Sequence, residues 1–258
     1  MATLVCFHAH PDDECIQTGG VMAKAAADGH RVVLVVATRG EHGEVPDGFL
    51  DHGEELWQRR VRETNDAAAH LGVERIEFLG YVDSGMVDTP ENHLDGSFWT
   101  ADLEEAAARL AGILSEEAAD VLTIYDDHGG YGHPDHIQVH RVGRRAAELA
   151  SIAKVYQATI NRDVIIDLVK RMPPDPDFSV RDIEDDPTFG TPMDQITCRV
   201  DVRSFMAQKR AAMRAHASQI SDTHFMLAMP DDVFAEAFGT EWFIRDGQGP
   251  GITETGIL

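Results

Sequence analysis

Short apolar runs without polar alternation are the feature that most constrains the fold of this chain. Residues 31–37 read RVVLVVA and residues 121–125 read VLTIY, and both runs are rich in β-branched or aromatic side chains. A strand that is apolar on both faces has to be covered on both faces, which is typical of the central strands of a parallel sheet. The two runs therefore predict a sheet that lies between two layers of helices.

Helical patterns separate these runs from other apolar runs, so strands and helices alternate as they do in βαβ units. The expected strands are residues 3–7, 31–37, 75–79, 121–125, 154–158 and 195–202, and the expected helices are residues 18–28, 54–71, 101–118, 135–150 and 202–217. Gly29 and Gly72 mark the ends of two of these helices. The prediction is an α/β fold, a Rossmann-like three-layer sandwich with a mostly parallel central sheet and a smaller C-terminal extension.

The length of 258 residues suits one α/β domain. We expect residues 1–160 to form the Rossmann-like, metal-binding core, and residues 161–258 to be the C-terminal part of the same domain that completes the cleft. Residues 172–194 contain five prolines and many acidic side chains. They predict an irregular segment, either a surface loop or an excursion over the active site. The tail around residues 242–244 is expected to pack on the domain.

Composition argues against several kinds of partner. A formal net charge of −23 disfavours nucleic acid and anionic membranes, because both need clustered Lys and Arg. The sequence offers no apolar stretch of about 20 residues for membrane insertion and no room for a signal peptide before the first strand. The three cysteines do not have the spacing of a disulfide framework or a zinc ribbon. We therefore expect a cytoplasmic protein with a small-molecule substrate; a homo-oligomer is compatible with the sequence.

Two polar runs follow two of the expected strands. HPDDE at residues 10–14 follows the first strand, and HPDH at residues 133–136 follows the fourth. In an open α/β sheet, ligands bind outside the carboxyl ends of the strands, at the point where the strand order reverses. If the first and fourth strands are neighbours, both polar runs converge on one crevice.

The two runs contain the parts of a hydrolytic metal site. His10, Asp13 and His136 offer three zinc ligands and leave a fourth position for water. Asp12 is next to a ligand and has to point elsewhere, which suits a general base. The runs therefore predict one Zn²⁺ per chain, although His and Asp ligands also accept Fe²⁺, Co²⁺ or Mn²⁺. His8 alternates with His10 along the strand and is expected to be structural.

These motifs resemble the LmbE-like or PIG-L family of zinc-dependent de-N-acetylases, and most of all its mycothiol-related branch. HPDDE and GHPDH carry the resemblance, and TRGE at residues 38–41, YVDSGM at residues 81–86 and RAHASQ at residues 214–219 extend it. The match runs from residue 3 to about residue 245. The resemblance implies a zinc enzyme that removes the N-acetyl group from an N-acetylglucosaminyl substrate.

The resemblance also implies roles for single residues. It places zinc on His10, Asp13 and His136, in agreement with the reasoning from the residues. Asp12 would be the general base, and His133 would stabilise the oxyanion.

The resemblance implies that Asp135 orients His133 and that Tyr131, on a mobile loop, reaches the oxyanion. Arg60 and Asp83 would hold sugar hydroxyls, and Gln17 stands where relatives distinguish their substrates.

Other functions stay open at this point. An amidase of mycothiol-type thiol conjugates would share the same site. A metal-binding protein without turnover is an alternative of another class, but it would not require Asp12. A dinucleotide-binding module is disfavoured, because Gly19 and Gly20 after the first strand do not form the G-x-G-x-x-G fingerprint.

Overall fold

The computed structural model describes residues 1–171 and 180–258. These residues form one seven-stranded sheet with the order β3-β2-β1-β4-β5-β7-β6. The strands are β1 (Thr3–His8), β2 (Arg31–Val36), β3 (Arg75–Phe78), β4 (Val121–Tyr125), β5 (Lys154–Thr159), β6 (Cys198–Asp201) and β7 (Thr240–Arg245). The first five strands are parallel, whereas β7 pairs antiparallel with both β5 and β6. The predicted α/β fold with a mostly parallel sheet is confirmed.

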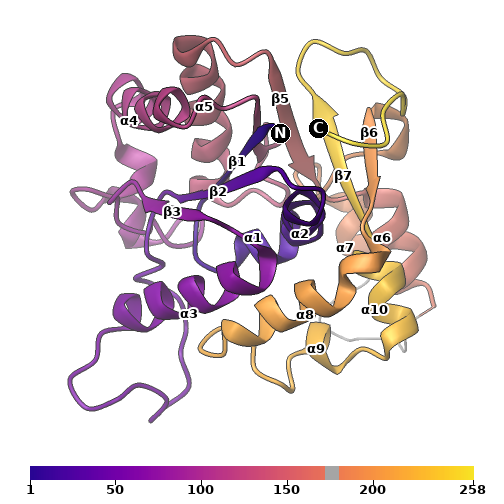
Figure 1. Ribbon diagram of the computed structural model, residues 1–258. Coiled ribbons are helices and arrows are strands. Elements are labelled where there is room, and N and C mark those ends of the chain that lie inside the picture. The colour runs from indigo at the N-terminus through magenta and orange to yellow at the C-terminus, as the bar shows by residue number, and fades with distance from the viewer. Residues whose placement is uncertain (172–179) are drawn as a thin grey trace.

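Helices cover both faces of this sheet. They are α1 (Asp13–Gln17), α2 (Gly19–Ala27), α3 (Leu56–Leu71), α4 (Leu103–Glu116), α5 (Pro134–Ala150), α6 (Arg162–Val169), α7 (Val180–Asp185), α8 (Met206–Ala215), α9 (Phe225–Ala228) and α10 (Asp231–Phe238), with short 3-10 helices η1 (Pro90–His93), η2 (Phe98–Thr100), η3 (Met193–Gln195) and η4 (Arg203–Phe205). α4 and α5 pack together on one side of the parallel strands, and α2, α3 and α8 pack together on the other (Figure 1).

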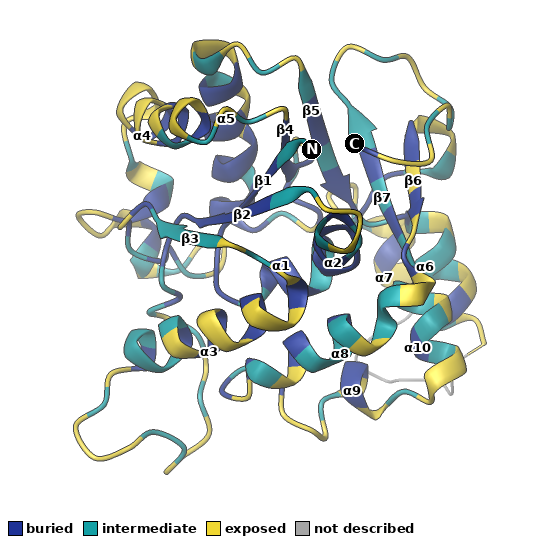
Figure 2. Ribbon diagram, viewed as in Figure 1, coloured by how far each residue is buried: buried dark blue, intermediate teal, exposed yellow. Residues whose placement is uncertain are grey.

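The strand order reverses at β1. β2 and β3 lie on one side of it, and β4 and β5 lie on the other. β1 pairs in parallel with both neighbours, so that Cys6 lies between Leu34 of β2 and Thr123 of β4. The central strands are almost wholly buried (Figure 2), as their continuous apolar runs require. The carboxyl ends of β1 and β4 therefore meet at the point where this fold class binds its ligands.

The differences from prediction lie mainly in the C-terminal part of the chain. β7 was expected only as a packed tail, and α6 was missed. Residues 172–194 were predicted to be irregular, and residues 172–179 of this segment lie outside the described residues. The rest of the segment contains α7 and η3, so the prediction is wrong for these two helices. α1 was also missed, because its five residues are too few for a helical period to be seen.

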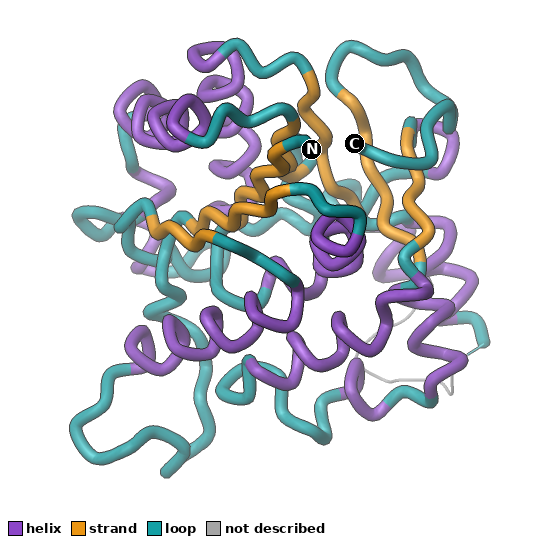
Figure 3. Tube along the Cα trace, in the orientation of Figure 1, coloured by secondary structure: helices purple, strands orange, loops and turns teal. Residues whose placement is uncertain are grey.

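The longest described excursion of the chain joins β2 to α3 and projects from the body (Figure 3). α3 begins where the excursion ends, at a capping box. The Glu55 side chain accepts the backbone N–H of Gln58, and the Gln58 side chain accepts the backbone N–H of Glu55. It ends at Gly72, whose φ of 72° is the left-handed conformation that glycine adopts without strain. The glycine stop predicted at this position is confirmed.

No helix within the described ranges has the length and apolar character needed to cross a membrane.

A buried ion pair ties the C-terminal part of the chain to α2. Lys209 on α8 and Glu241 on β7 lie 2.5 Å apart, and both side chains are almost wholly buried. The Glu241 carboxylate also accepts the backbone N–H groups of Gly20 and Val21, at 2.7 and 2.8 Å. These amides open α2, so the negative charge also meets the positive end of the helix dipole.

Replacement of Lys209 by Met is expected to destabilise the fold strongly, because it leaves the Glu241 carboxylate buried without its cation. We expect a loss of about 3–5 kcal/mol in the free energy of unfolding, measured by urea denaturation. The matched control is Lys24→Met, because Lys24 pairs with Asp28 on the exposed surface of α2. A Lys209 variant that unfolds at the same urea concentration as this control would contradict the role of the pair.

Candidate active site

The two polar runs lie side by side because β1 and β4 are neighbours. HPDDE spans the turn after β1 and the first residues of α1, and HPDH spans the end of the loop after β4 and the first residues of α5. The ring centroids of His10 and His133 are 4.7 Å apart, although the two residues lie far apart in the sequence. The predicted convergence of the two runs is confirmed.

The Asp13 carboxylate lies between two imidazole rings. Its Oδ2 is 3.3 Å from His10 Nδ1, and its Oδ1 is 3.4 Å from His136 Nε2. All three residues are buried. The backbone N–H of His10 donates to Asp13 Oδ2 at 2.8 Å, which fixes the carboxylate in the turn.

This donor set fits a divalent cation such as zinc. Donors about 2.0–2.1 Å from a tetrahedral ion lie about 3.3–3.4 Å from one another, and both measured separations are of this size. His136 Nε2 is buried and makes no hydrogen bond. The other nitrogen of this ring, Nδ1, lies 3.2 Å from the Gly129 carbonyl, which places the proton on Nδ1 and the lone pair on Nε2.

Other potential ligands surround the same rings. His10, His133 and His136 form one group, and His10, Asp83 and Asp135 form another. In the second group both carboxylates face His10 Nε2, at 3.4 Å for Asp83 and 3.1 Å for Asp135. They hold the imidazole proton on Nε2 and leave Nδ1 to face Asp13, as carboxylates behind a metal-binding histidine do.

Asp12 is next to Asp13 in the chain but has a different partner. Its φ of 101° is rare for a residue with a side chain, and its carboxylate is 18% exposed. Arg60 Nη2 lies 3.3 Å from Asp12 Oδ2. Burial raises the pKa of Asp12 to about 6, while the Arg60 guanidinium opposes the rise. A carboxyl group with a pKa near neutrality can both accept and release a proton.

His133 opens α5 as its N-cap, and its Nδ1 accepts the backbone N–H of Asp135 at 3.1 Å. Burial, followed by the neighbouring rings of His10 and His136, lowers the pKa of His133 to about 3. The ring is therefore neutral at pH 7, and because Nδ1 accepts a hydrogen bond, the proton is on Nε2. An N–H of this kind can donate to a developing oxyanion.

The side chain and the backbone of Asp135 have different partners, and its predicted role in orienting His133 stays a prediction. Its carboxylate accepts from His10 Nε2 and from the backbone N–H of Ser84, at 3.1 and 2.9 Å. Asp135 meets His133 through its backbone amide instead, because His133 caps the helix on which Asp135 is the second residue.

Arg60 and Asp83 are buried, with 4% and 5% of their surfaces exposed. The Arg60 guanidinium donates to the carbonyls of Gly40 and Pro11, at 2.9 and 2.5 Å. Asp83 accepts backbone N–H groups, among them that of Gly85 at 2.8 Å, in addition to its contact with His10. Both side chains therefore hold the loops around the site, and their contact with a substrate stays a prediction.

Tyr131 lies at the surface of the site, 38% exposed, with its ring centroid 5.0 Å from that of His136. It stands between Gly130 and Gly132, which have φ values of 78° and 89°. Gln17 is half-buried at the end of α1. The predicted roles of Tyr131 and Gln17 stay predictions.

Several residues of the site were not assigned from the sequence. Glu14 and His216 lie in the quoted motifs, yet only the structure shows that they are partners: Glu14 Oε1 and His216 Nε2 are 2.5 Å apart. Tyr125 stacks on the His136 ring, with centroids 4.6 Å apart. The Tyr125 hydroxyl forms a hydrogen bond with His8. His8 is buried, as expected of a structural residue.

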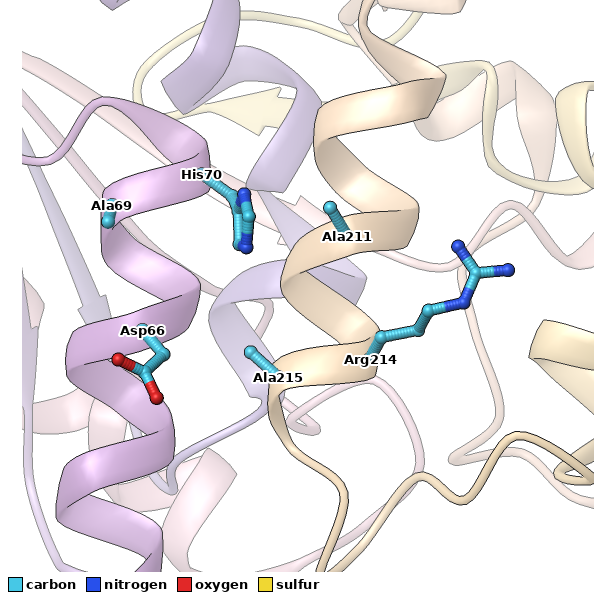
Figure 4. Close-up of a pocket in the computed structure, with 6 residues that line it drawn as sticks. All are labelled: Asp66, Ala69, His70, Ala211, Arg214 and Ala215. Carbon is cyan, nitrogen blue, oxygen red and sulfur yellow. The ribbon is translucent and has the colours of Figure 1, made fainter.

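A groove between α3 and α8 lies apart from these residues (Figure 4). It is lined by Asp66, Ala69, His70, Ala211, Arg214 and Ala215, none of which belongs to the two polar runs. The chemistry of the site therefore does not extend into it.

Comparison with known proteins identifies the family. A sequence model described as GlcNAc-PI de-N-acetylase matches residues 5–147. A 1D-myo-inositol 2-acetamido-2-deoxy-alpha-D-glucopyranoside deacetylase from Acidothermus cellulolyticus is 42% identical over 257 residues, which cover 94% of this chain and 88% of the relative.

Solved structures show the same fold. An N,N'-diacetylchitobiose deacetylase from Pyrococcus horikoshii is 23% identical with a TM-score of 0.57, over 94% of this chain and 83% of that one. A 4-carboxy-2-hydroxymuconate hydratase from Pseudomonas putida is 19% identical with a TM-score of 0.62, over 96% of this chain and 97% of that one. Because these two proteins are named for different reactions, the fold alone does not define the chemistry.

The geometry around Asp13 predicts stoichiometric metal binding. After removal of metal by a chelator, the chain is expected to bind one equivalent of Zn²⁺ by isothermal titration calorimetry. Asp13→Ala should weaken binding by at least about 100-fold. Loss of a group that only hydrogen-bonds to a metal ligand typically weakens binding by about 10- to 100-fold, and Asp13 is itself a predicted ligand. Asp127→Ala is the control, since this aspartate is exposed on the other polar loop. Equal affinity in the two variants would contradict the predicted site.

Proposed function

The chain belongs to the GlcNAc-PI de-N-acetylase family, and on this premise we propose that it is a zinc-dependent hydrolase that removes the acetyl group from an N-acetylglucosaminyl substrate by means of an activated water molecule. The names of its relatives make an N-acetylglucosaminyl inositol the first substrate to test. One observation carries the proposal: a second carboxylate, that of Asp12, is directly next to the candidate ligand Asp13 in the chain, is held by Arg60 at 3.3 Å, and has a strained backbone with a φ of 101°.

The conformation of Asp12 supports a catalytic role. A metal-binding protein without turnover needs His10, Asp13 and His136, but it does not need a second carboxylate next to them. Backbone strain of the kind found at Asp12 typically costs about 1–3 kcal/mol and persists only where the surrounding structure enforces it. Such strain concentrates at functional sites, which favours an enzyme over a storage protein.

We assign the metal to His10, Asp13 and His136. Zinc bound there supplies a Lewis acid for the acetyl carbonyl and lowers the pKa of water toward ~7. The nitrogen and carboxylate donors suit zinc, and the same donors accept Fe²⁺ as well. We assign zinc, because two imidazoles and one carboxylate are a donor set that holds zinc in other hydrolases.

Asp12 moves the protons of the reaction. Its carboxylate takes a proton from the attacking water as the oxygen bonds to the acetyl carbon. The tetrahedral intermediate then collapses, the carbon–nitrogen bond breaks, and Asp12 returns the proton to the departing amine. The products are acetate and the free amino sugar. Arg60 keeps the carboxylate in place through the contact of 3.3 Å.

His133 and Tyr131 act on the other side of the carbonyl. Negative charge develops on the acetyl oxygen in the transition state, and the Nε2–H of a neutral His133 donates to it. Tyr131 reaches the same oxygen from the glycine-rich loop. Although the Tyr131 side chain is partly exposed, desolvation around its hydroxyl, followed by the charge of Asp13, raises the pKa of that hydroxyl, which keeps the group protonated as a donor.

The remaining assignments concern the substrate and the cell. We propose that Arg60, Asp83 and Gln17 hold sugar hydroxyls. We also propose a cytoplasmic location, which the free and buried thiols of Cys6, Cys15 and Cys198 support.

Asp12→Asn is expected to abolish proton transfer while it preserves the shape of the side chain. Amine release from N-acetylglucosaminyl inositol should fall by about 100- to 10,000-fold in kcat. Zinc content, measured on the same samples by atomic emission, should stay at one equivalent. If the variant keeps full activity with full zinc content, the assignment of the base is wrong. If the unaltered chain releases no amine from any N-acetylated amino sugar, the substrate class is wrong.

His133→Ala is expected to lower kcat by about 100- to 1,000-fold, the typical effect of the loss of one oxyanion donor. The effect on KM should be small, because the hydrogen bond strengthens only as charge develops. The control is His128→Ala on the same loop, where the ring pairs with Asp126 and Asp127 instead. A loss of equal size in both variants would point to a disordered loop and against the role of His133.

A further inference from the structure

The peptide groups around Asp12 are held from several directions. The Asp12 N–H donates to Glu14 Oε2 at 2.9 Å, and its carbonyl accepts from Cys15 Sγ at 2.9 Å. The carbonyl of the preceding residue, Pro11, accepts from the Arg60 guanidinium. These contacts enclose the residue whose φ is 101°, so they oppose its relaxation to an unstrained conformation.

Glu14 depends on a partner from the far end of the chain. Its Oε1 lies 2.5 Å from Nε2 of His216, which is 202 residues further along the sequence. Neither side chain has any exposed surface. A buried carboxylate needs a partner for each oxygen, and here one oxygen holds His216 while the other holds the Asp12 amide.

We propose that His216 is a positioning residue for the deacetylation reaction: through Glu14 it fixes the backbone of Asp12 and so aims the carboxylate of the general base. This inference rests on the proposed function for its catalytic consequence. The claim that His216 and Glu14 fix the Asp12 backbone is structural, however, and can be tested without substrate. His216 follows the end of α8, so the C-terminal part of the chain contributes to the geometry of a site built on β1 and β4.

The segment that carries His216 has an anchor of its own. Ser218 donates from its backbone N–H and its hydroxyl to the Glu63 carboxylate on α3, at 2.9 and 2.6 Å. This contact does not involve Glu14 or Asp12. Loss of the His216 side chain should therefore release Glu14 without freeing the whole segment.

A second metal site is the competing interpretation of the same residues. Glu14, Cys15 and His216 offer ligand atoms within 4.8 Å of one another. The glutamate oxygens and the thiol are already engaged, however, in the hydrogen bonds that hold the Asp12 peptide. Burial also raises the pKa of the Cys15 thiol well above its ordinary value, so the thiolate that a metal requires is disfavoured.

The first test compares steady-state kinetics of three variants on N-acetylglucosaminyl inositol. His216→Ala should lower kcat by on the order of 100-fold with KM within about twofold, because a small misplacement of a catalytic group has an effect of this size. His216→Gln, whose amide can reach Glu14, should recover a large part of the loss. His52→Ala is the matched control, because this histidine is exposed in the segment between β2 and α3, and it should stay within about threefold of the unaltered chain. If His216→Ala does not fold, His216→Asn, which is too short to reach Glu14, takes its place.

The second test needs no substrate. Hydrogen exchange measured by mass spectrometry on the peptide that contains Asp12 should be faster in His216→Ala, and unchanged in His216→Gln and His52→Ala. Zinc stoichiometry should stay at one equivalent throughout. If the unaltered chain releases no amine, the proposed function fails, but the exchange data still show whether His216 and Glu14 fix the Asp12 backbone.

Three results would overturn the inference. The first is unchanged exchange at Asp12 in His216→Ala. The second is faster exchange with undiminished kcat. The third is a second zinc equivalent that is lost in His216→Ala, which would establish the metal site instead.

Discussion

The parallel pairing of β1 with β4 is the constraint on which the rest of the site depends. It brings the turn after β1 against the start of α5, so that Asp13 can meet His136 at 3.4 Å. Both strands are buried on their two faces, and a slip of either strand would move its end away from the other. The apolar runs that make the sheet thus also fix the distances between the polar side chains.

Such a site gathers several carboxylates in a space with little water, where unpaired charges are very unfavourable. In the structure each of these carboxylates has a partner. Asp13, Asp83 and Asp135 surround the ring of His10, Glu14 bonds to His216, and Asp12 faces Arg60. A divalent cation between Asp13 and the two imidazoles would add the positive charge that this arrangement still favours. The same pairing explains why Arg60 and Asp83 are so deeply buried.

The sequence was sufficient to predict the central sheet and the meeting of the two polar runs at its edge, because both follow from local patterns. Continuous apolar runs indicate the parallel strands, and the order of the strands brings HPDDE to HPDH. The partner of a side chain is a different matter, since it depends on the path of the whole chain. Asp135 was expected to orient His133, but only the structure shows that its backbone amide meets His133 while its carboxylate meets His10. β7 was missed as a strand for a similar reason, because its place beside β5 is set by tertiary pairing.

The hydratase with the same fold shows why the C-terminal part of the chain matters to the argument. If the sheet alone does not define the reaction, the difference has to come from how single side chains are held at its edge. Here α8 and the residue after it supply two contacts to α1: Lys209 donates to the Ile16 carbonyl, and His216 bonds to the Glu14 carboxylate. Both contacts reach the stretch that contains Asp12 and Asp13. The C-terminal extension is therefore part of the framework that orients the proposed general base, and the chemistry of the first turn cannot be separated from the last third of the chain.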